Sequence, residues 1–293
     1  MQIPYTPISH CYLSFSKIYN LSKVNISFLL SIVLKKNVVW GFPFRVGIEP
    51  VNFCNLSCPE CDCGTKQLQR KPAILDTTEY KKFIWSNHKK IIAIQLFGQG
   101  EPFLHPELPN LIHIAHQHKL YTSTSTNGHF LNEENCKKII HSGLDKIIIS
   151  LDGTNQQVYE IYRLGGNIET VTNGIKTLAE TKTKLKSKNP FIAVQFLVFK
   201  HNQDQIRNLK ILAKNLGANG IEFKSGQINS LTNQIKVPDG EFEKFSRYIK
   251  NENGELKLKK KIRFCYRLWS SMTIFSDGRV SSCCYDKIGR AHV

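Results

Sequence analysis

Short apolar runs alternate with longer amphipathic stretches along most of the chain from Phe44 onward. Short apolar runs bounded by turn residues are typical of buried strands, and apolar positions repeating every three to four residues are typical of helices. The pattern predicts strands at Phe44–Pro50, Ile91–Phe97, Tyr121–Thr126, Lys146–Leu151, Phe191–Phe199 and Gly220–Phe223. It predicts helices near Thr77–His88, Glu107–His118, Glu133–Ser142, Ile168–Lys184 and Asp204–Leu216.

Residues at the ends of these stretches support the predicted boundaries. Asp76 and Glu79 have capping-box spacing before the first of these helices. Gly143 and Gly217 follow helical patterns where a left-handed glycine often ends a helix. Strands that alternate with helices indicate βαβ units and a parallel sheet. Six units are too few for the closed eight-stranded barrel, so we expect an α/β fold with a partial (βα)6 TIM-like barrel and a small α+β C-terminal region.

The domain organisation follows from where this pattern begins and fades. Residues 1–43 form an aromatic and basic extension, with a short amphipathic helix expected near Ile26–Leu34. Gly41 and Pro43 then break any helix. Residues 44–235 are the predicted barrel domain.

Residues 236–287 are expected to form the smaller C-terminal region. It contains a helix candidate at Asp239–Asn251. A β-hairpin is predicted within 272–282, because the Asp277-Gly278 pair between apolar runs favours the positive φ of a tight turn. Residues 288–293 fit no preceding pattern and can be encoded by DNA that resembles a common sequencing adapter, so we expect a non-native tail.

Composition and charge exclude several classes of protein. Apolar residues make up 41% of the chain, which excludes a mainly disordered or collagen-like protein. The longest apolar candidate, Val24–Leu34, is shorter than the roughly 18 residues of a membrane-spanning helix, so a polytopic membrane protein is excluded. The net charge of +17 attracts anions without choosing among nucleic acid, anionic lipid and acidic peptide. A solvated basic face is the simplest interpretation, because the lysines are spread along the chain.

Four of the nine cysteines lie within ten residues, at Cys54, Cys58, Cys61 and Cys63. The N-terminus has no secretory signal pattern, so we expect metal ligands in the reducing cytoplasm rather than disulfides. The first three follow the first predicted strand, and loops at the carboxyl ends of parallel strands build active sites. Three thiolates can hold an iron–sulfur cluster with one iron left open. A zinc site with Cys63 or a distant fourth ligand is the alternative.

The Cys-x3-Cys-x2-Cys spacing of Cys54, Cys58 and Cys61 after the first strand resembles the motif of the radical S-adenosylmethionine (SAM) superfamily. The resemblance implies a [4Fe-4S] cluster whose fourth iron is chelated by the amino and carboxylate groups of SAM. It also implies reductive cleavage of SAM to methionine and a 5′-deoxyadenosyl radical that abstracts hydrogen from the substrate. Glu60 departs from the aromatic or apolar residue that often faces the adenine in this family.

The segment FGQGEP after the second strand is similar to the Gly-Gly-Glu motif of the same family, with Gln99 in place of the first glycine. Glycine lets a backbone approach a ligand closely, and a carboxylate can accept a hydrogen bond from an ammonium group. The resemblance implies that Gly100 and Glu101 bind the methionyl amino group. A simple glycine turn before a proline is the alternative.

Three further residues are implied SAM contacts by the same resemblance. Ser150 and Asp152, at the end of the fourth strand, are candidates for the ribose side. Arg163, in the following Tyr-Arg-Leu-Gly-Gly segment, is implied to pair with the methionyl carboxylate. Turn chemistry for the first two, and a helix-capping surface arginine for the third, are the alternatives.

The C-terminal region resembles the opening of a SPASM domain, the auxiliary-cluster module of peptide-modifying radical SAM enzymes. Cys265 is followed by 12 residues, Gly278, 4 residues and Cys283. The resemblance implies Cys265 and Cys283 as ligands of an auxiliary [4Fe-4S] cluster in the full-length protein. Two cysteines cannot complete such a site, so we expect a C-terminally truncated SPASM-like region. Cys284 is a weaker ligand candidate, because successive strand residues point to opposite faces.

These features together predict a radical SAM enzyme that modifies a peptide, a protein or a small molecule. A flavodoxin or ferredoxin is the expected electron donor, and the basic surface suits such acidic partners. A first alternative is an RNA-modifying radical SAM enzyme, although the chain shows no RNA-recognition module and a nucleic-acid partner is not expected. A second alternative is a non-catalytic metal- or cluster-binding adaptor, with membrane contact through Val24–Leu34.

Overall fold

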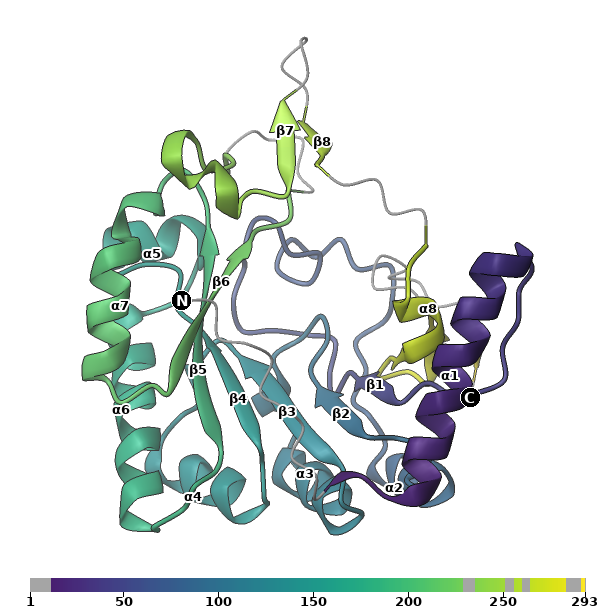
Figure 1. Cartoon of the computed structure of the whole chain (residues 1–293). Coiled ribbons are helices and arrows are strands. Elements are labelled where there is room, and N and C mark those ends of the chain that lie inside the picture. The colour runs from purple at the N-terminus through teal and green to yellow at the C-terminus, as the bar shows by residue number, and fades with distance from the viewer. Residues whose placement is uncertain (1–11, 229–234, 251–255, 260–263, 283–290, 293) are drawn as a thin grey trace.

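The computed structural model describes residues 12–228, 235–250, 256–259, 264–282 and 291–292. Its centre is a nine-stranded sheet in the order β11-β10-β9-β1-β2-β3-β4-β5-β6 (Figure 1). The strands are β1 (Arg45–Ile48), β2 (Ala93–Leu96), β3 (Tyr121–Thr126), β4 (Lys146–Ser150), β5 (Phe191–Val198), β6 (Gly220–Ser225), β9 (Ser271–Ile274), β10 (Arg279–Ser281) and β11 (Ala291–His292). A separate antiparallel pair is formed by β7 (Tyr248–Lys250) and β8 (Leu256–Leu258).

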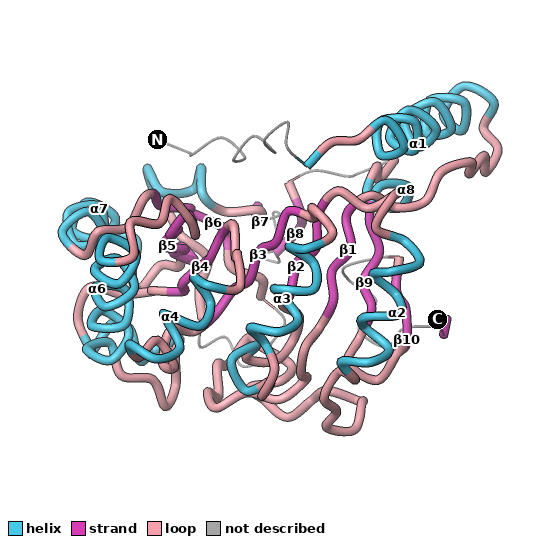
Figure 2. The backbone as a smooth tube through the Cα atoms, turned by 90° about the horizontal axis from the view of Figure 1, so that it is seen from below, coloured by secondary structure: helices cyan, strands magenta, loops and turns pink. Residues whose placement is uncertain are grey.

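Helices connect the strands and cover one face of the curved sheet (Figure 2). The α-helices are α1 (Phe15–Leu34), α2 (Thr77–Asn87), α3 (Leu108–Gln117), α4 (Glu133–His141), α5 (Gln156–Tyr162), α6 (Ile168–Lys184), α7 (Ile206–Asn215) and α8 (Arg267–Ser270). The 3-10 helices are η2 (Pro102–Leu104), η3 (Gln203–Gln205) and η4 (Gly240–Phe245). No helix in the described part of the chain has both the length and the apolar character needed to cross a bilayer.

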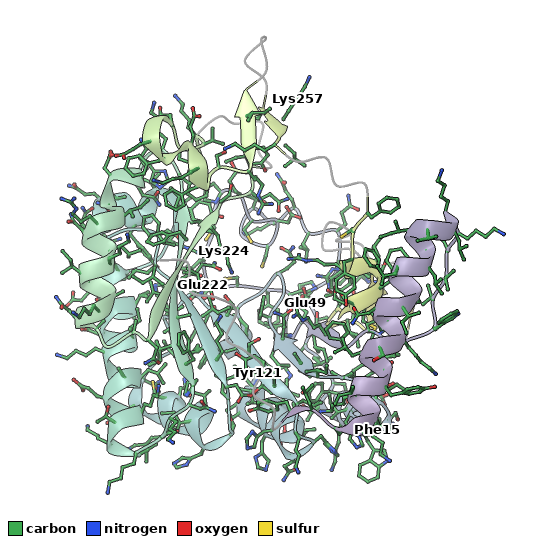
Figure 3. All side chains as sticks on the ribbon, viewed as in Figure 1. Phe15, Glu49, Tyr121, Glu222, Lys224 and Lys257 are labelled. Atoms are coloured by element: carbon green, nitrogen blue, oxygen red, sulfur yellow. The ribbon has the colours of Figure 1, made fainter. Side chains whose placement is uncertain are left out.

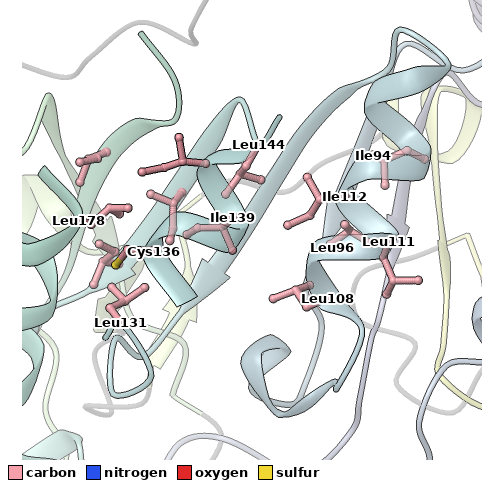
Figure 4. Close-up of a cluster of buried hydrophobic side chains, with 14 of the residues drawn as sticks. Ile94, Leu96, Leu108, Leu111, Ile112, Leu131, Cys136, Ile139, Leu144 and Leu178 are labelled. Atoms are coloured by element: carbon pink, nitrogen blue, oxygen red, sulfur yellow. The ribbon is translucent and has the colours of Figure 1, made fainter. Parts of the chain in front are cut away.

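Strands β1 to β6 are parallel to their neighbours, so their carboxyl ends share one edge of the sheet. The core lies between the sheet and the outer helices, where apolar side chains of α3, α4 and α6 meet those of the strands. Figure 4 shows part of this cluster, with Ile112 of α3, Ile139 of α4 and Leu178 of α6. The predicted α/β fold with a partial TIM-like barrel is therefore confirmed.

The C-terminal residues extend the barrel sheet instead of forming a separate layer. The predicted hairpin is present as β9 and β10, and Gly278 has the positive φ of 82° that its turn requires. Strand β9 pairs in parallel with β1, with Val46 opposite Met272. The hairpin thereby places its turn beside the loop that follows β1.

The structure differs from the sequence predictions at two predicted helices and contains one α-helix that was not predicted. Helix α1 begins at Phe15 rather than near Ile26, and Ser14 accepts a hydrogen bond from the Lys17 N–H to cap it. Helix α5 was not predicted, since its seven residues are too few for a clear period.

The helix predicted at 239–251 is wrong. The chain forms only the 3-10 turn η4 there and then enters β7. Pairing of Tyr248 with Leu258 in the small sheet, and a hydrogen bond from the Ile228 N–H to the Tyr248 hydroxyl at 3.1 Å, replace the helical bonds. Tertiary pairing here overrides local helical preference.

Candidate functional site

The cysteines Cys54, Cys58 and Cys61 lie in one loop at the carboxyl end of β1. Cys58 is buried, whereas Cys54 and Cys61 are partly exposed. The Cys61 N–H donates to the Cys58 carbonyl at 3.2 Å, and the Leu56 N–H donates to Cys54 Sγ at 3.4 Å. Gly64 permits this tight turn, because a Cβ there would come within 2.6 Å of the Cys58 backbone nitrogen and oxygen. The backbone is thus folded closely around the middle cysteine.

The environment of these thiols disfavours bare thiolates. Burial raises the pKa of Cys54 to about 11, and the negative charges of Glu101 and the other two cysteines add to the shift. Burial also raises the pKa of Cys58, although the positive charge of Arg163 opposes it. Thiolates are the form that binds metal, so the loop needs further positive charge to hold its sulfurs in that form. The donor set therefore fits a cationic metal cofactor.

The spacing of the ligands distinguishes a cluster from a single zinc ion. The described residues contain no group of three or more His, Cys, Asp or Glu side chains gathered closely enough to hold one metal ion. Structural zinc needs four ligands around one ion, whereas the cysteines of an iron–sulfur cluster bind separate irons. Cys63 has another partner, since its Sγ lies 3.5 Å from the Asn52 carbonyl oxygen that accepts its hydrogen bond. The arrangement fits an iron–sulfur cluster better than zinc.

The Gly98–Glu101 segment lies against the backbone of the cysteine loop. A Cβ at Gly100 would come within 2.4 Å of the Val51 carbonyl oxygen and 2.6 Å of the Phe53 carbonyl oxygen. The Glu101 N–H donates to the Phe53 carbonyl at 3.0 Å. Glycine is therefore required at position 100 for the two loops to approach this closely, which supports the close-approach interpretation of this motif.

The Glu101 carboxylate is buried with three hydrogen-bond donors. It accepts from Thr126 Oγ1 at 2.7 Å, from the Asn127 N–H at 2.8 Å and from the Phe103 N–H at 3.2 Å. Burial nevertheless raises the pKa of Glu101 to about 7, with these hydrogen bonds and the charge of Arg163 opposing the shift. A cationic partner such as an ammonium group would restore the carboxylate form.

Asp152 and Arg163 form an ion pair beside the middle cysteine. Arg163 Nε donates to Asp152 Oδ2 at 2.6 Å, and Arg163 Nη1 lies 3.8 Å from Cys58 Sγ. The second oxygen of the Asp152 carboxylate accepts from the Leu197 N–H at 2.6 Å. The Asp152 side chain is fully buried, so its visible role is to orient the arginine toward the cysteine loop.

The remaining predicted site residues are Ser150, Cys265 and Cys283, and they belong to different parts of the chain. Ser150 is buried as the last residue of β4, two positions before Asp152 in the chain. Cys265 is partly exposed just before α8, and its carbonyl accepts from the Leu268 N–H at 3.1 Å. Cys283 and Cys284 lie outside the described residues. The structure therefore brings together the cysteine loop, Glu101, Asp152 and Arg163.

Asn127 was not among the residues predicted for the site. Its Nδ2 donates to Asn55 Oδ1 at 2.8 Å and lies 3.7 Å from Cys54 Sγ, so it links the end of β3 to the cysteine loop. The Ser-Thr-Asn-Gly sequence at the end of a predicted strand is the signal that could have identified it.

The buried ion pair between Glu49 and Arg70 was also missed. Arg70 donates to both carboxylate oxygens of Glu49, at 2.7 and 2.8 Å, and both side chains have no exposed surface. Glu49 also accepts from the Gln99 N–H at 3.1 Å and from the Ser276 hydroxyl at 2.9 Å. Figure 3 shows Glu49 between the barrel and the C-terminal hairpin. This carboxylate joins the cysteine loop, the Gly98–Glu101 segment and the β9–β10 turn.

A parallel partial barrel with a three-cysteine loop after its first strand defines the class of protein. The sequence matches the Radical SAM superfamily over residues 48–210, which is more than half of the chain. The chain therefore belongs to the radical SAM superfamily and is a radical SAM enzyme, and its family implies a [4Fe-4S] cluster and SAM as cofactors.

Curated relatives share part of this chain at modest identity. The PqqA peptide cyclase of Gluconobacter oxydans is 27% identical over 186 residues, which cover 63% of this chain and 50% of the relative. The probable GTP 3′,8-cyclase of Methanococcus maripaludis strain C5 is 28% identical over 176 residues, covering 60% of this chain and 56% of the relative. The chain thus matches about half of the length of these relatives.

The solved structure of Streptococcus suis SuiB bound to S-adenosylmethionine has a similar fold. Its TM-score is 0.67, and the match covers 94% of this chain and 74% of that one. The sequence identity is 12%, so this likeness concerns the fold alone.

Proposed function

We propose that Cys54, Cys58 and Cys61 hold the [4Fe-4S] cluster and that the enzyme modifies a peptide or protein side chain. The observation that carries the ligand assignment is the convergence of this loop, Glu101 and Arg163 at the carboxyl edge of the sheet. Burial raises the pKa values of Cys54 and Cys58, so their thiolates are unfavourable in the cluster-free loop, which is the situation that bound iron relieves.

The chain's own residues have distinct roles in this proposal. When bound, the cluster and SAM supply an electron transfer and a carbon-centred radical for hydrogen abstraction. Arg163, held by Asp152, places positive charge beside the Cys58 sulfur. Glu101 offers a buried acceptor for the methionyl ammonium group, and Gly100 lets this segment approach the cysteine loop. Ser150 is proposed on the ribose side.

The Asp152 carboxylate has a more specific role than the sequence suggested. Both of its oxygens already accept hydrogen bonds, from Arg163 and from the Leu197 backbone. We propose that it reaches SAM through the arginine that it orients, because its side chain has no exposed surface and one of its oxygens is held by the Arg163 guanidinium.

A peptide substrate is favoured over a nucleotide by the C-terminal region. The Cys265 and Cys283 spacing that resembles a SPASM domain is typical of peptide-modifying members, and one curated relative is named as a peptide cyclase. We propose both cysteines as ligands of an auxiliary cluster. A GTP-type substrate is the second candidate, since another relative is named as a probable GTP cyclase.

The ligand assignment is tested by anaerobic reconstitution with iron and sulfide. The wild-type protein should bind the cluster and form 5′-deoxyadenosine from SAM and dithionite. Cys58→Ala should lose both properties. Cys63→Ala is the matched control, because this thiol lies in the same loop with the Asn52 carbonyl as its partner, and it should retain both. Retention of the cluster and of SAM cleavage by Cys54→Ala, Cys58→Ala or Cys61→Ala would refute the assignment.

The substrate class is tested on the reconstituted protein in separate arms. Peptides encoded beside the gene should accelerate 5′-deoxyadenosine formation and change mass themselves, whereas GTP should do neither. Acceleration by GTP with conversion of the nucleotide would replace the peptide proposal and leave the ligand assignment intact.

A further inference from the structure

Helix α1 has an inverted distribution of polar and apolar residues. Its buried positions are Lys17, Asn20, Val24, Ser27 and Ser31, of which only one is apolar. An amphipathic surface helix normally turns its apolar stripe toward the core. Here the polar face is the one that lies against the protein.

The inward polar groups are satisfied by backbone partners. Asn20 Nδ2 donates to the carbonyls of Phe42 at 2.8 Å and Lys90 at 3.0 Å, and its Oδ1 accepts from the Phe42 N–H at 2.9 Å. Ser31 Oγ accepts from the Val38 N–H at 3.0 Å. Lys17 Nζ donates to the Lys119 carbonyl at 2.6 Å. These bonds fix the rotation of α1 about its axis.

The opposite face of α1 is apolar and exposed, and we call it the outer stripe. Its members lie one helical turn or a multiple of it apart: Phe15, Tyr19, Ile26, Leu29 and Val33, with exposed fractions of 86%, 57%, 48%, 60% and 74%. Figure 3 shows Phe15 at one end of the helix, and Figure 1 shows α1 at the outer edge of the molecule beside α8. Ser22, also exposed, lies between Tyr19 and Ile26 on this face. A row of exposed apolar side chains of this kind marks an interaction surface.

Charge around the stripe identifies the kind of surface that covers it. Residues 1–48 contain no Asp or Glu, and the first acidic residue is Glu49. The same segment contains lysines on and directly after the helix, including Lys23, Lys35 and Lys36, and the last two are exposed. Trp40, which follows them, is 57% exposed. Apolar and aromatic side chains flanked only by cations are complementary to an anionic lipid surface.

We propose that α1 lies in the plane of an anionic membrane surface, with the outer stripe in the headgroup region. A second copy of the chain is a poorer occupant, because pairing two stripes would bring lysines together with no acidic residue in the segment to offset them. A helix of 20 residues extends about 30 Å along the surface. It does not span the bilayer, in agreement with its mixed composition.

Vesicle flotation of the full chain tests this inference. The wild type should float with phosphatidylglycerol-containing vesicles, bind pure phosphatidylcholine vesicles weakly, and dissociate as salt is raised. The double substitution Leu29→Glu with Val33→Glu should reduce anionic-vesicle binding by about tenfold or more. Ile211→Glu is the control: it places one acidic side chain on α7 at a residue that is 57% exposed, and it should bind like the wild type.

A second variant separates charge from apolar contact. Lys35→Gln with Lys36→Gln should weaken binding to anionic vesicles by about tenfold and remove most of its salt dependence, while leaving the weak binding to neutral vesicles unchanged. Circular dichroism confirms folding of each variant, which is expected because the changed side chains point to solvent.

Two outcomes would overturn the inference. One is failure of the folded wild type to bind phosphatidylglycerol vesicles at low salt. The other is a lipid-free dimer, detected by light scattering, that the Leu29→Glu and Val33→Glu pair dissociates, because the stripe would then be covered by a second copy. Neither outcome concerns the cluster ligands, which the reconstitution assay tests separately.

Discussion

The cysteine loop and helix α1 both bury polar groups, but they differ in how these groups are satisfied. Around α1, Asn20 and Ser31 find backbone partners within the protein. In the cysteine loop, burial raises the pKa values of Cys54 and Cys58, and within the described part of the chain Arg163 is the cation that opposes the shift at Cys58. Buried thiols whose charged form is unfavourable point to a missing metal ligand. A helix whose polar face is fully hydrogen-bonded to the protein leaves its apolar face available to a partner.

The largest expected effect comes from the buried ion pair that supports the cysteine loop. Glu49→Ala removes both close carboxylate contacts of buried Arg70 and leaves it only the more distant Asp277 carboxylate, at 3.8 Å. Breaking a buried pair in this way costs about 3–5 kcal/mol of unfolding free energy. Lys82→Ala, which breaks an exposed and solvent-screened pair with Glu79, should change the unfolding free energy little. Urea denaturation of the cluster-free protein measures both. Equal losses in the two variants would show that the pair does not organise the site.

The Glu101 carboxylate gives the next largest effect. Glu101→Gln should weaken SAM binding to the reconstituted enzyme about 10- to 100-fold, because a hydrogen bond to a charged group contributes about 1.5–3 kcal/mol. The stability of the variant without SAM should change less than its SAM affinity, because the buried charge that is lost is itself unfavourable, although a buried donor such as the Asn127 N–H loses its acceptor. Equilibrium binding and thermal unfolding test the two parts. Glu134→Gln, on an exposed carboxylate, should change neither. Unchanged SAM affinity in Glu101→Gln would contradict the assignment.

The inward face of α1 predicts a smaller loss of stability. Asn20→Ala removes an amide that makes three hydrogen bonds to backbone groups, and leaving buried partners unsatisfied costs about 1–3 kcal/mol. Ser22→Ala on the exposed side should be near neutral. Hydrogen exchange of the α1 amides locates the effect. If the α1 amides are equally protected from exchange in both variants, the hydrogen bonds of the inward polar face do not hold the helix in place.

Lys17 predicts an effect on stability that depends on pH. Burial, with a contribution from Lys119, lowers the pKa of Lys17 to about 8. Between that value and the ordinary lysine pKa near 10.4, the unfolded chain binds the proton and the folded chain does not, so stability should rise with pH in this window. Lys17→Met should remove that rise, measured as the difference in unfolding free energy between the variant and wild type across pH 7.5–10. A difference that is constant with pH would contradict it.

Much of the barrel could be predicted from the sequence because its signals are local. Strand β3 and helix α6 have the predicted bounds, Asp76 caps α2 through the Thr78 and Glu79 N–H groups, and Gly143 has a φ of 84° after α4. Each of these depends on residues close in sequence. The cysteine loop was identified for the same reason, since its three thiols lie within eight residues.

The parts that could not be predicted depend on distant partners. Glu49 and Arg70 are separated by loop residues with no periodic pattern, so only the fold shows that they pair. The helix expected at 239–251 does not form, because its last residues pair as β7 with β8. The pairing of β9 with β1 joins residues more than 200 positions apart, for which a single sequence contains no signal.

The sequence by itself determined the order of the barrel strands, the partial barrel and the grouping of three cysteines after its first strand. Only the tertiary structure decided which charges face that centre, that Asp152 orients Arg163, and that α1 turns its polar face inward. The physical reason is that periodicity reports which residues share a face, whereas the side of a helix that is buried depends on what it packs against. For α1 the partners were backbone groups of residues 38, 42, 90 and 119, and these selected the polar face.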